Sequence, residues 1–176
     1  MKILSWNVRG LGSPQRVRRL RHLLKTCDPH IVFFMETKLC GIQMERVDPE
    51  GTRGGLCLAW RNDVNISLKN FSKRHIDVVV HDNEREVIWR FTGFYGTPYA
   101  QDREDSWAIP KNLRNGENNP WLVCGDFNEV MYGFEKKGGL PRDERQMEIF
   151  RKTLEFFQLN DVRYLGRWLH GKEVIS

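Results

Sequence analysis

Residues 121–128 are Trp-Leu-Val-Cys-Gly-Asp-Phe-Asn, and this stretch decides the fold class that we expect. Its four leading apolar residues are typical of a strand buried on both faces, as in the sheet of an α/β protein. Side chains alternate along an extended chain, so Asp126 and Asn128 would share one face while Phe127 packs on the other. The same residues also favour an Asx turn that caps the strand. Taken alone, the stretch leaves the two interpretations equally open.

A strand, a helix and a second strand are predicted at the N-terminus. The first strand spans Lys2 to Val8 and presents Asn7 at its end, the helix spans about Gln15 to Thr26, and Ile31–Met35 is a buried strand followed by Glu36. A strand, helix and strand within this span predict a βαβ unit with two parallel strands. Because α/β sheets build their sites at the carboxyl ends of strands, Asn7 and Glu36 are candidate functional residues.

The middle of the chain is predicted to form an antiparallel meander. Four strand-like segments are separated by turn residues, namely Leu56–Trp60, Val64–Phe71, Ile76–His81 and Glu86–Tyr95. Towards the C-terminus, Asp143 is a predicted N-cap of an amphipathic helix that ends near Phe157. Weaker patterns indicate a helix over residues 101–113 and a strand over residues 160–165.

Composition indicates one ordinary globular domain over residues 1–176, with 40% hydrophobic and 29% charged residues. The sequence contains neither a stretch long enough to cross a membrane nor an N-terminal apolar run long enough for a signal peptide. Four widely spread cysteines, with Cys57 and Cys124 in apolar runs, favour buried thiols in a reducing compartment and make a zinc site improbable. A charge of +5 is compatible with a polyanionic partner.

Several familiar motifs are absent or incomplete. Residues 166–172 match Gly-x-x-x-x-Gly-Lys, but Glu173 replaces the Ser or Thr that would bind magnesium, and no helix can follow. The sequence has no Gly-x-Ser-x-Gly and no His-Glu-x-x-His. His75 and His81 are roughly 20 Å apart by strand rise, which is too far to share a metal.

Polar residues at strand ends therefore carry the predicted chemistry. Magnesium prefers oxygen ligands, often one or two carboxylates together with water and substrate phosphate. Glu36 is a candidate ligand, and Asn7 would orient it or touch the metal. Asp126 and Asn128 would align a water and a scissile phosphate, while Tyr95 would donate to a phosphate oxygen. From composition alone, Tyr95 is better explained as an ordinary aromatic at a strand end.

The predicted N-terminal helix has a strongly basic face. Its cationic residues are Arg16, Arg18, Arg19, Arg21, His22 and Lys25. Such a run usually marks a solvated surface, and the alternative is a surface that contacts phosphates. On this alternative, the candidate substrate-binding residues are Arg9, Arg16 and Arg19.

Five ordered blocks resemble a known family. They are Ser-Trp-Asn-Val-Arg-Gly-Leu-Gly (5–12), Asp-Pro-His-Ile-Val-Phe-Phe-Met-Glu-Thr-Lys (28–38), Gly-Gly-Leu-Cys-Leu-Ala-Trp (54–60), Gly-Phe-Tyr-Gly-Thr-Pro (93–98) and Trp-Leu-Val-Cys-Gly-Asp-Phe-Asn-Glu (121–129). Together they are similar to the endonuclease/exonuclease/phosphatase superfamily, and most closely to the endonuclease of plant LINE-type (non-LTR) retrotransposons. Residues 135–151 resemble the same subgroup.

The resemblance implies a two-sheet α/β sandwich of the DNase I-like type and DNA cleavage that depends on Mg²⁺, with Mn²⁺ as a substitute. It further implies that the protein acts in the nucleus and that a reverse transcriptase domain follows in the intact element. No small-molecule cofactor or membrane partner is implied. The residue matching Glu36 binds the metal, and the one matching Asn7 supports it. The match to Tyr95 contacts phosphate, and those to Asp126 and Asn128 position the water and stabilise the transition state.

Two departures from the family pattern qualify this expectation. The family has a later Asp and a closing Ser-Asp-His, whereas this sequence contains no Asp-His dipeptide. Residues 39–53 also look shorter than the usual connection. We therefore expect an N-terminal portion of the domain that lacks the final strands, has open strand edges and cleaves DNA weakly or not at all. The alternatives are a non-catalytic nucleic-acid-binding remnant and, less favoured, a phosphatase or sphingomyelinase of the same fold.

Overall fold

The computed structural model describes residues 1–37, 55–99, 119–136 and 138–161, the backbone of 46–47 and 172–175, and the single residues Asp102 and Trp107. The chain divides into two compact units. Unit 1 comprises residues 1–95, 119–125 and 164–176, and unit 2 comprises residues 96–118 and 126–163. The chain passes between the units after residues 95, 118, 125 and 163, and each unit is described by itself.

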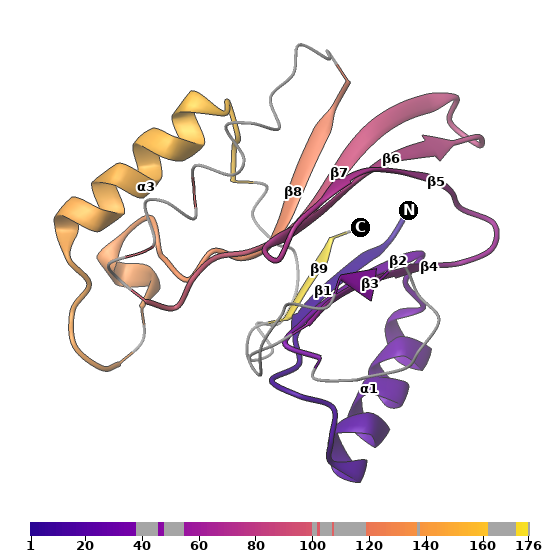
Figure 1. Ribbon diagram of the computed structural model, residues 1–176, viewed down its shortest axis with the longest axis horizontal. Helices are drawn as coiled ribbons and strands as arrows, with labels where there is room; N and C mark the ends of the chain where they lie inside the picture. Colours follow the sequence, from indigo (N-terminus) through magenta and orange to yellow (C-terminus); the bar gives the residue numbers. More distant parts are fainter. Residues whose placement is uncertain are drawn as a thin grey trace. The chain divides into compact units, whose positions relative to one another are not determined.

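Unit 1 contains a five-stranded sheet in the order β3-β4-β2-β1-β9 (Figure 1). Its strands are β1 (Ile3–Asn7), β2 (Ile31–Met35), β3 (Arg46–Val47), β4 (Leu56–Trp60) and β9 (Lys172–Ile175). β1 and β2 are parallel, with Ile3 opposite Ile31 and Asn7 opposite Met35, and α1 (Pro14–Cys27) joins them. The predicted βαβ unit is confirmed, and Asn7 lies one register position before Glu36.

The second sheet of unit 1 has the order β5-β6-β7-β8. It comprises β5 (Asn65–Phe71), β6 (His75–Asp82), β7 (Val87–Tyr95) and β8 (Trp121–Asp126). β6 pairs antiparallel with both β5 and β7, which confirms three strands of the predicted meander. The fourth assignment was wrong, because β4 pairs antiparallel with β2 in the other sheet. Turn residues at 62–63 show where β4 ends, but they do not determine which strand it pairs with.

The strand formed by the apolar run at residues 121–124 is less buried than predicted. β8 lies at the edge of its sheet, and within it only Cys124 is buried. A continuous apolar run therefore did not mean burial on both faces here. β9 was not predicted as a strand, and it pairs antiparallel with β1, whose edge it covers.

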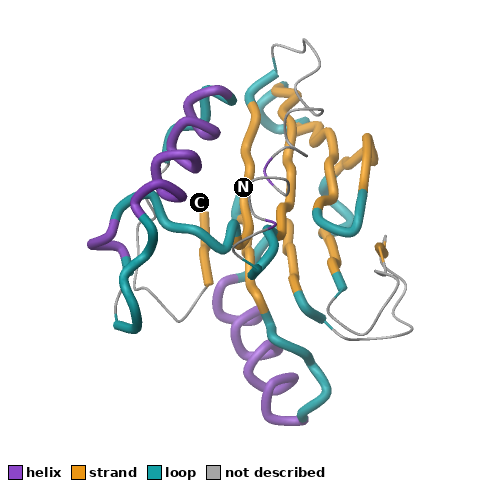
Figure 2. Tube along the Cα trace, turned by 60° about the vertical axis from the view of Figure 1, so that its left-hand side comes forward, coloured by secondary structure: helices purple, strands orange, loops and turns teal. Residues whose placement is uncertain are grey.

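The two sheets pack face to face around one core. Alternate residues of β1, β2 and β4 meet alternate residues of β6 and β7, and the Phe33 and Phe91 rings contact edge to face with centroids 6.4 Å apart. The opposite face of the first sheet carries Leu4, Trp6 and Phe34, which pack against the apolar stripe of α1. Figure 2 shows α1 as the lower of the two long helices. Ser13 caps α1 by accepting from the Arg16 backbone N–H at 3.3 Å.

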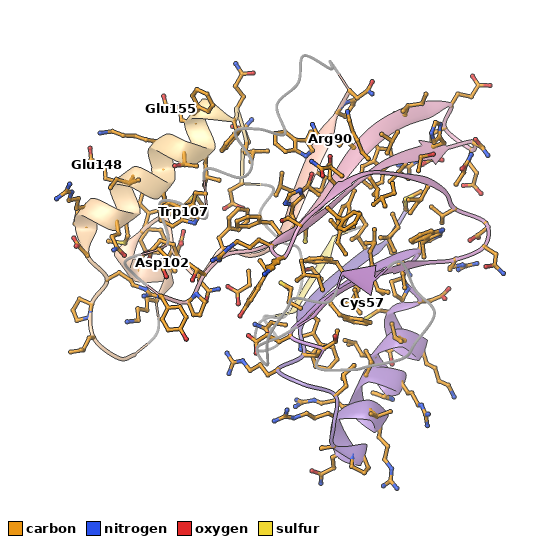
Figure 3. All side chains as sticks on the ribbon, in the orientation of Figure 1. Cys57, Arg90, Asp102, Trp107, Glu148 and Glu155 are labelled. Carbon is orange, nitrogen blue, oxygen red and sulfur yellow. The ribbon has the colours of Figure 1, made fainter. Side chains whose placement is uncertain are left out.

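A buried polar network spans three strands of the second sheet. Arg90, labelled in Figure 3, donates to both carboxylate oxygens of Asp77 at 2.8 and 2.7 Å. The Thr92 hydroxyl donates to Asp77 Oδ1 at 2.7 Å and accepts from Trp121 Nε1 at 2.8 Å. Since removing one partner of a buried ion pair typically costs about 3–5 kcal/mol, this network fixes the register of β6 and β7.

Unit 2 contains η2 (Gly133–Glu135) and α3 (Glu144–Phe156). Asp143 caps α3 and Phe150 is buried in it, so the predicted helix is confirmed. Trp107 lies beside α3 in Figure 3, and its ring and that of Phe127 lie 5.0 and 5.5 Å from the ring of Phe150. The predicted helix over 101–113, apart from Asp102 and Trp107, and the predicted strand over 160–165, apart from residues 160–161, lie outside the described residues.

In the described part of the chain, no helix is long and apolar enough to cross a membrane. No disulfide joins the cysteines of that part, of which Cys124 is buried while Cys27 and Cys57 are half-buried. The predicted burial therefore holds fully for Cys124 and partly for Cys57.

Candidate active site

Three of the predicted site residues meet at one carboxylate in unit 1. Asn7 Nδ2 donates to Glu36 Oε1 at 2.8 Å, and the Tyr95 hydroxyl donates to the same oxygen at 2.7 Å. All three side chains are half-buried, and they come from the ends of β1, β2 and β7. We call Asn7, Glu36 and Tyr95 the Glu36 cluster. It holds an acidic oxygen in a fixed orientation through two donors.

The backbone that follows β1 keeps Asn7 next to Glu36. Beyond the last strand pair, Val8 N donates to Met35 O at 3.0 Å and Gly10 N donates to Glu36 O at 2.6 Å. Asn7 Oδ1 accepts from Arg9 N at 3.1 Å, which turns the amide so that its NH₂ group faces Glu36. Backbone pairing of the segments after β1 and β2 thus continues past the strands and places Asn7 in contact with Glu36.

Arg16 holds the same loop in place. Its guanidinium donates to the carbonyls of Arg9 and Gly10, the latter at 3.0 Å. These bonds give Arg16 a structural role in the loop after Asn7, and its predicted contact with substrate stays a prediction. Arg9 and Arg19 are exposed, so a contact of either with substrate stays a prediction.

In unit 2, Asp126 and Asn128 form a tight turn. Asn128 N donates to Asp126 Oδ1 at 2.9 Å, Asn128 Nδ2 donates to Gly96 O at 2.7 Å, and Gly96 N donates to Asp126 O at 2.8 Å. We call Gly96, Asp126 and Asn128 the Asp126 turn. The first bond is the Asx turn that the sequence left open. Strand alternation does not bring the two side chains together, because β8 ends at Asp126 and Asn128 has φ 57°.

A glycine is required at position 96, where the segment after β7 packs against residues 126–128. A Cβ built on Gly96 would lie 2.4 Å from the carbonyl oxygen of Phe127, so any side chain would displace the turn. Phe127 itself points to the aromatic contact with Phe150, which agrees with its predicted packing away from the polar pair.

Sequence reasoning missed a charged pair that supports the Asp126 turn. Glu129, whose side chain is fully buried, forms an ion pair with Arg142 at 3.4 Å. Arg142 Nη2 also donates to Asn128 O at 3.4 Å. Both residues fall inside the blocks that carry the family resemblance, and Glu129 directly follows Asn128, so a signal for the pair was present in the sequence.

Unusual backbone conformations gather at the predicted residues. Six described non-glycine residues have positive φ, and three of them are Arg9 (48°), Glu36 (56°) and Asn128 (57°). Such conformations cost free energy and cluster at functional sites, where the surrounding structure maintains them. Their location therefore favours a functional role for both groups of residues.

A hollow in unit 1 lies away from the Glu36 cluster. It has a volume of about 350 Å³ and is lined by Met1, Val87, Trp121 and neighbouring residues. These belong to the amino-terminal ends of β1, β7 and β8, whereas the Glu36 cluster uses the carboxyl ends of β1 and β7. The hollow therefore does not mark the predicted chemistry.

The residues present are compatible with a hard divalent cation. Among the described residues, no three His, Cys, Asp or Glu side chains gather as a metal site. Magnesium does not require such a cage, because it commonly binds through one or two carboxylates, waters and substrate phosphates. A fixed, half-buried carboxylate such as Glu36 suits that mode of binding.

Residues 4–169 match the sequence model of the endonuclease/exonuclease/phosphatase family. The chain belongs to that family. No curated protein matches the sequence. Its two-sheet α/β sandwich is the DNase I-like fold of the family, as the sequence predicted.

Solved structures of the same fold are distant in sequence. The endonuclease domain of TRAS1, a telomere-specific non-LTR retrotransposon, has 14% identity and a TM-score of 0.65 over 88% of this chain and 71% of that one. The AP endonuclease LMAP from Leishmania major has 14% identity and a TM-score of 0.63 over 88% of this chain and 66% of that one. Human nocturnin has 17% identity and a TM-score of 0.57 over 74% of this chain and 64% of that one. The chain thus spans about two thirds of each of these structures.

Proposed function

We propose that this chain is the endonuclease of a plant LINE-type (non-LTR) retrotransposon and hydrolyses phosphodiester bonds of DNA with the help of Mg²⁺, for which Mn²⁺ substitutes. In the intact element a reverse transcriptase domain would follow, and the protein would act in the nucleus. Membership of the family and the similarity of the fold to a retrotransposon endonuclease domain support this proposal.

One observation carries the proposal. Glu36 Oε1 accepts two hydrogen bonds, from Asn7 and Tyr95, at the carboxyl ends of three strands. A carboxylate that is fixed in this way loses little conformational freedom when it binds a cation. Glu36 would hold the Mg²⁺ ion, and Asn7 would keep the carboxylate oriented. The Tyr95 hydroxyl would donate a hydrogen bond to Glu36 or to the substrate phosphate. The bound cation would neutralise charge on the phosphate oxygens.

Asp126 and Asn128 would act on the attacking water and on the developing charge. In hydrolysis, water adds to phosphorus, the bond to the leaving sugar oxygen breaks, and a proton moves from the water to a base. Asp126 would accept a hydrogen bond from that water and orient it. Asn128 would stabilise the charge that develops on the phosphate.

Plasmid nicking tests the proposed function. We expect Mg²⁺-dependent nicking of supercoiled plasmid that is lost in EDTA and in Glu36→Gln, which keeps the size of the side chain and removes its charge. Without an Asp-His pair in the sequence, the rate should be low, because general acid–base groups contribute about 10²–10⁴-fold. Nicking that persists unchanged in Glu36→Gln would refute the assignment.

A second candidate function is DNA binding without cleavage. The exposed basic residues of α1, including Arg18, Arg19 and Arg21, favour it. Salt-dependent binding of DNA with no nicking at any Mg²⁺ concentration would support this candidate. A phosphatase of the same fold would instead hydrolyse a phosphoinositide faster than plasmid DNA.

A further inference from the structure

Unit 2 exposes two stacked aromatic rings next to the Asp126 turn in the sequence. The Tyr132 and Phe134 rings are parallel to within 6°, with centroids 5.5 Å apart. Tyr132 is 46% exposed and Phe134 is 82% exposed, which is unusual for a phenylalanine. Phe134 lies in η2, the short orange turn between β8 and α3 in Figure 1. The stack therefore presents an open aromatic surface to solvent.

This surface is held in a fixed conformation. Met131 N donates to Glu135 Oε2 at 2.9 Å, and Glu135 N donates to Tyr132 O at 3.1 Å. Arg151 of α3 donates from Nη1 to Met131 O at 2.5 Å, and its guanidinium carbon lies 5.3 Å from the centre of the Tyr132 ring. The two rings are therefore positioned before any ligand arrives, which lowers the entropy cost of binding.

The charges around the stack do not favour a phosphate. Glu135 accepts from Met131 N, and Glu144 accepts from Arg151 Nη2 at 2.8 Å. Lys136, the cation nearest in sequence, donates to the carbonyl of Leu140. The carboxylates and the cations beside the rings are thus bonded to one another or to the backbone. A flat, uncharged ligand fits this surface better than an anion does.

The size of the surface favours a nucleobase over a protein. Stable protein interfaces bury about 800 Å² on each partner, far more than the faces of two rings. A single unpaired base needs only one ring face, and bases stack on exposed aromatic side chains in many nucleic-acid-binding proteins. We propose that the Tyr132–Phe134 stack binds an unpaired base of the DNA substrate. This inference rests on the proposed function only in that the base would belong to that substrate.

Binding in EDTA tests the inference without requiring cleavage. The probe is a DNA duplex with one unpaired base at its centre, compared by fluorescence anisotropy with the same duplex fully paired. We expect Phe134→Ala to weaken binding of the first duplex by about tenfold and to leave the second unchanged. Because stacking is not ionic, the tenfold ratio should be the same at about 50 and about 200 mM salt.

Two further variants control the experiment. Phe156→Ala removes another exposed phenylalanine, on α3, and should bind both duplexes like the wild type. Phe134→Tyr keeps an aromatic ring and should restore binding. Equal binding of the unpaired-base duplex by Phe134→Ala and wild type would overturn the inference. Self-association that Phe134→Ala abolishes, with DNA binding unchanged, would assign the surface to a second copy and would equally overturn it.

The outcomes separate this inference from the proposed function. Glu36→Gln should keep the wild-type ratio of affinities for the two duplexes, because Tyr132 and Phe134 are unaffected. If plasmid nicking does not depend on Glu36 while binding depends on Phe134, the proposed function fails and the inference stands. If nicking depends on Glu36 while binding does not depend on Phe134, the inference fails and the proposed function stands.

Discussion

The Glu36 cluster and the Asp126 turn both place a carboxylate at the end of a strand, but different interactions hold them. Side chains at the ends of two other strands, Asn7 on β1 and Tyr95 on β7, converge on Glu36, and both donate to its carboxylate. Asp126 is held by a backbone turn in which its own carboxylate accepts a backbone N–H. The first arrangement depends on strand register and the second on local chain geometry. Substitutions should therefore affect the two groups in different ways.

The largest effects are expected from Glu36→Gln and Asp126→Asn. Each substitution removes a charge and keeps a hydrogen-bond acceptor, so Asn at position 126 still closes the turn. We expect both to lower the nicking rate by about 10²–10⁴-fold. Only Glu36→Gln should raise the Mg²⁺ concentration that gives the half-maximal rate. An equal shift of the Mg²⁺ dependence in both variants would contradict the separate roles, and circular dichroism would confirm folding.

Gly96→Ala should damage the Asp126 turn without altering any of its other side chains. The added Cβ would lie 2.4 Å from Phe127 O, and forcing extra volume into a packed site costs about 1–3 kcal/mol. We expect a melting temperature lower by roughly 2–10 °C and a nicking rate at least about tenfold lower. Gly12→Ala is the matched control, since nothing lies within 4 Å of its Cβ position. Similar melting of both variants would show that the turn tolerates displacement.

Tyr95→Phe should weaken the Glu36 cluster by a single hydrogen bond. The phenol donates to Glu36 Oε1 at 2.7 Å, and a bond to a charged group contributes about 1.5–3 kcal/mol. We expect a nicking rate about tenfold lower or somewhat worse. Tyr99→Phe removes the hydroxyl of an exposed tyrosine outside the cluster and should leave the rate unchanged. A wild-type rate in Tyr95→Phe would mean that Asn7 alone orients the carboxylate.

The smallest expected effect is the dependence on pH of the free energy of unfolding of unit 1. Burial lowers the pKa of His75 below its usual 6.5. Nearby Asp77 opposes this shift only in part, and Arg90 reinforces it. Its Nδ1 contacts Ser72 Oγ at 2.7 Å, while Nε2 has no hydrogen-bond partner among the described residues. Below about pH 6.5 the unfolded chain takes up a proton that the folded chain does not, so the free energy of unfolding should fall. Above that pH, His75 should contribute no pH dependence.

Urea denaturation between about pH 7.5 and about pH 5.5 measures this effect. The slope should not exceed about 1.4 kcal/mol per pH unit for one group, and His75→Gln should remove it. His81→Gln changes a half-buried histidine on the same strand and serves as the control. Because His75 pairs with Phe94, next to Tyr95, acid should loosen the strand that carries part of the Glu36 cluster. A slope that survives in His75→Gln would assign the titration to another group.

The sequence predicted the elements of this fold better than their pairing. Periodicity located β1, α1, β2 and α3, because each has an apolar pattern, and Asp143 marked the start of α3. The pairing of β4 with β2 was not predictable from the turn at residues 62–63, since pairing depends on contacts distant in the sequence. β9 is only four residues long and has no distinctive period.

The candidate site was predicted in its residues and only partly in its geometry. Strand ends identified Asn7, Glu36 and Tyr95. The register of β1 and β2 explains why Asn7 meets Glu36, and the packing of the two sheets brings Tyr95 of β7 to the same carboxylate. Alternation could not describe Asn128, because the left-handed backbone there takes the chain out of the strand. The bonds from Arg16 and Arg142 to backbone carbonyls were missed, because carbonyls leave no mark in the sequence.

The central claim is that Glu36 binds the divalent cation, and metal binding tests it most directly. Titration of Mn²⁺ into the protein, followed by the electron paramagnetic resonance signal of free Mn²⁺, reports the number of bound ions without any need for cleavage. We predict one bound ion in the wild type and in Asp126→Asn, and none at the same concentrations in Glu36→Gln. Equal Mn²⁺ binding by the wild type and Glu36→Gln would contradict the account.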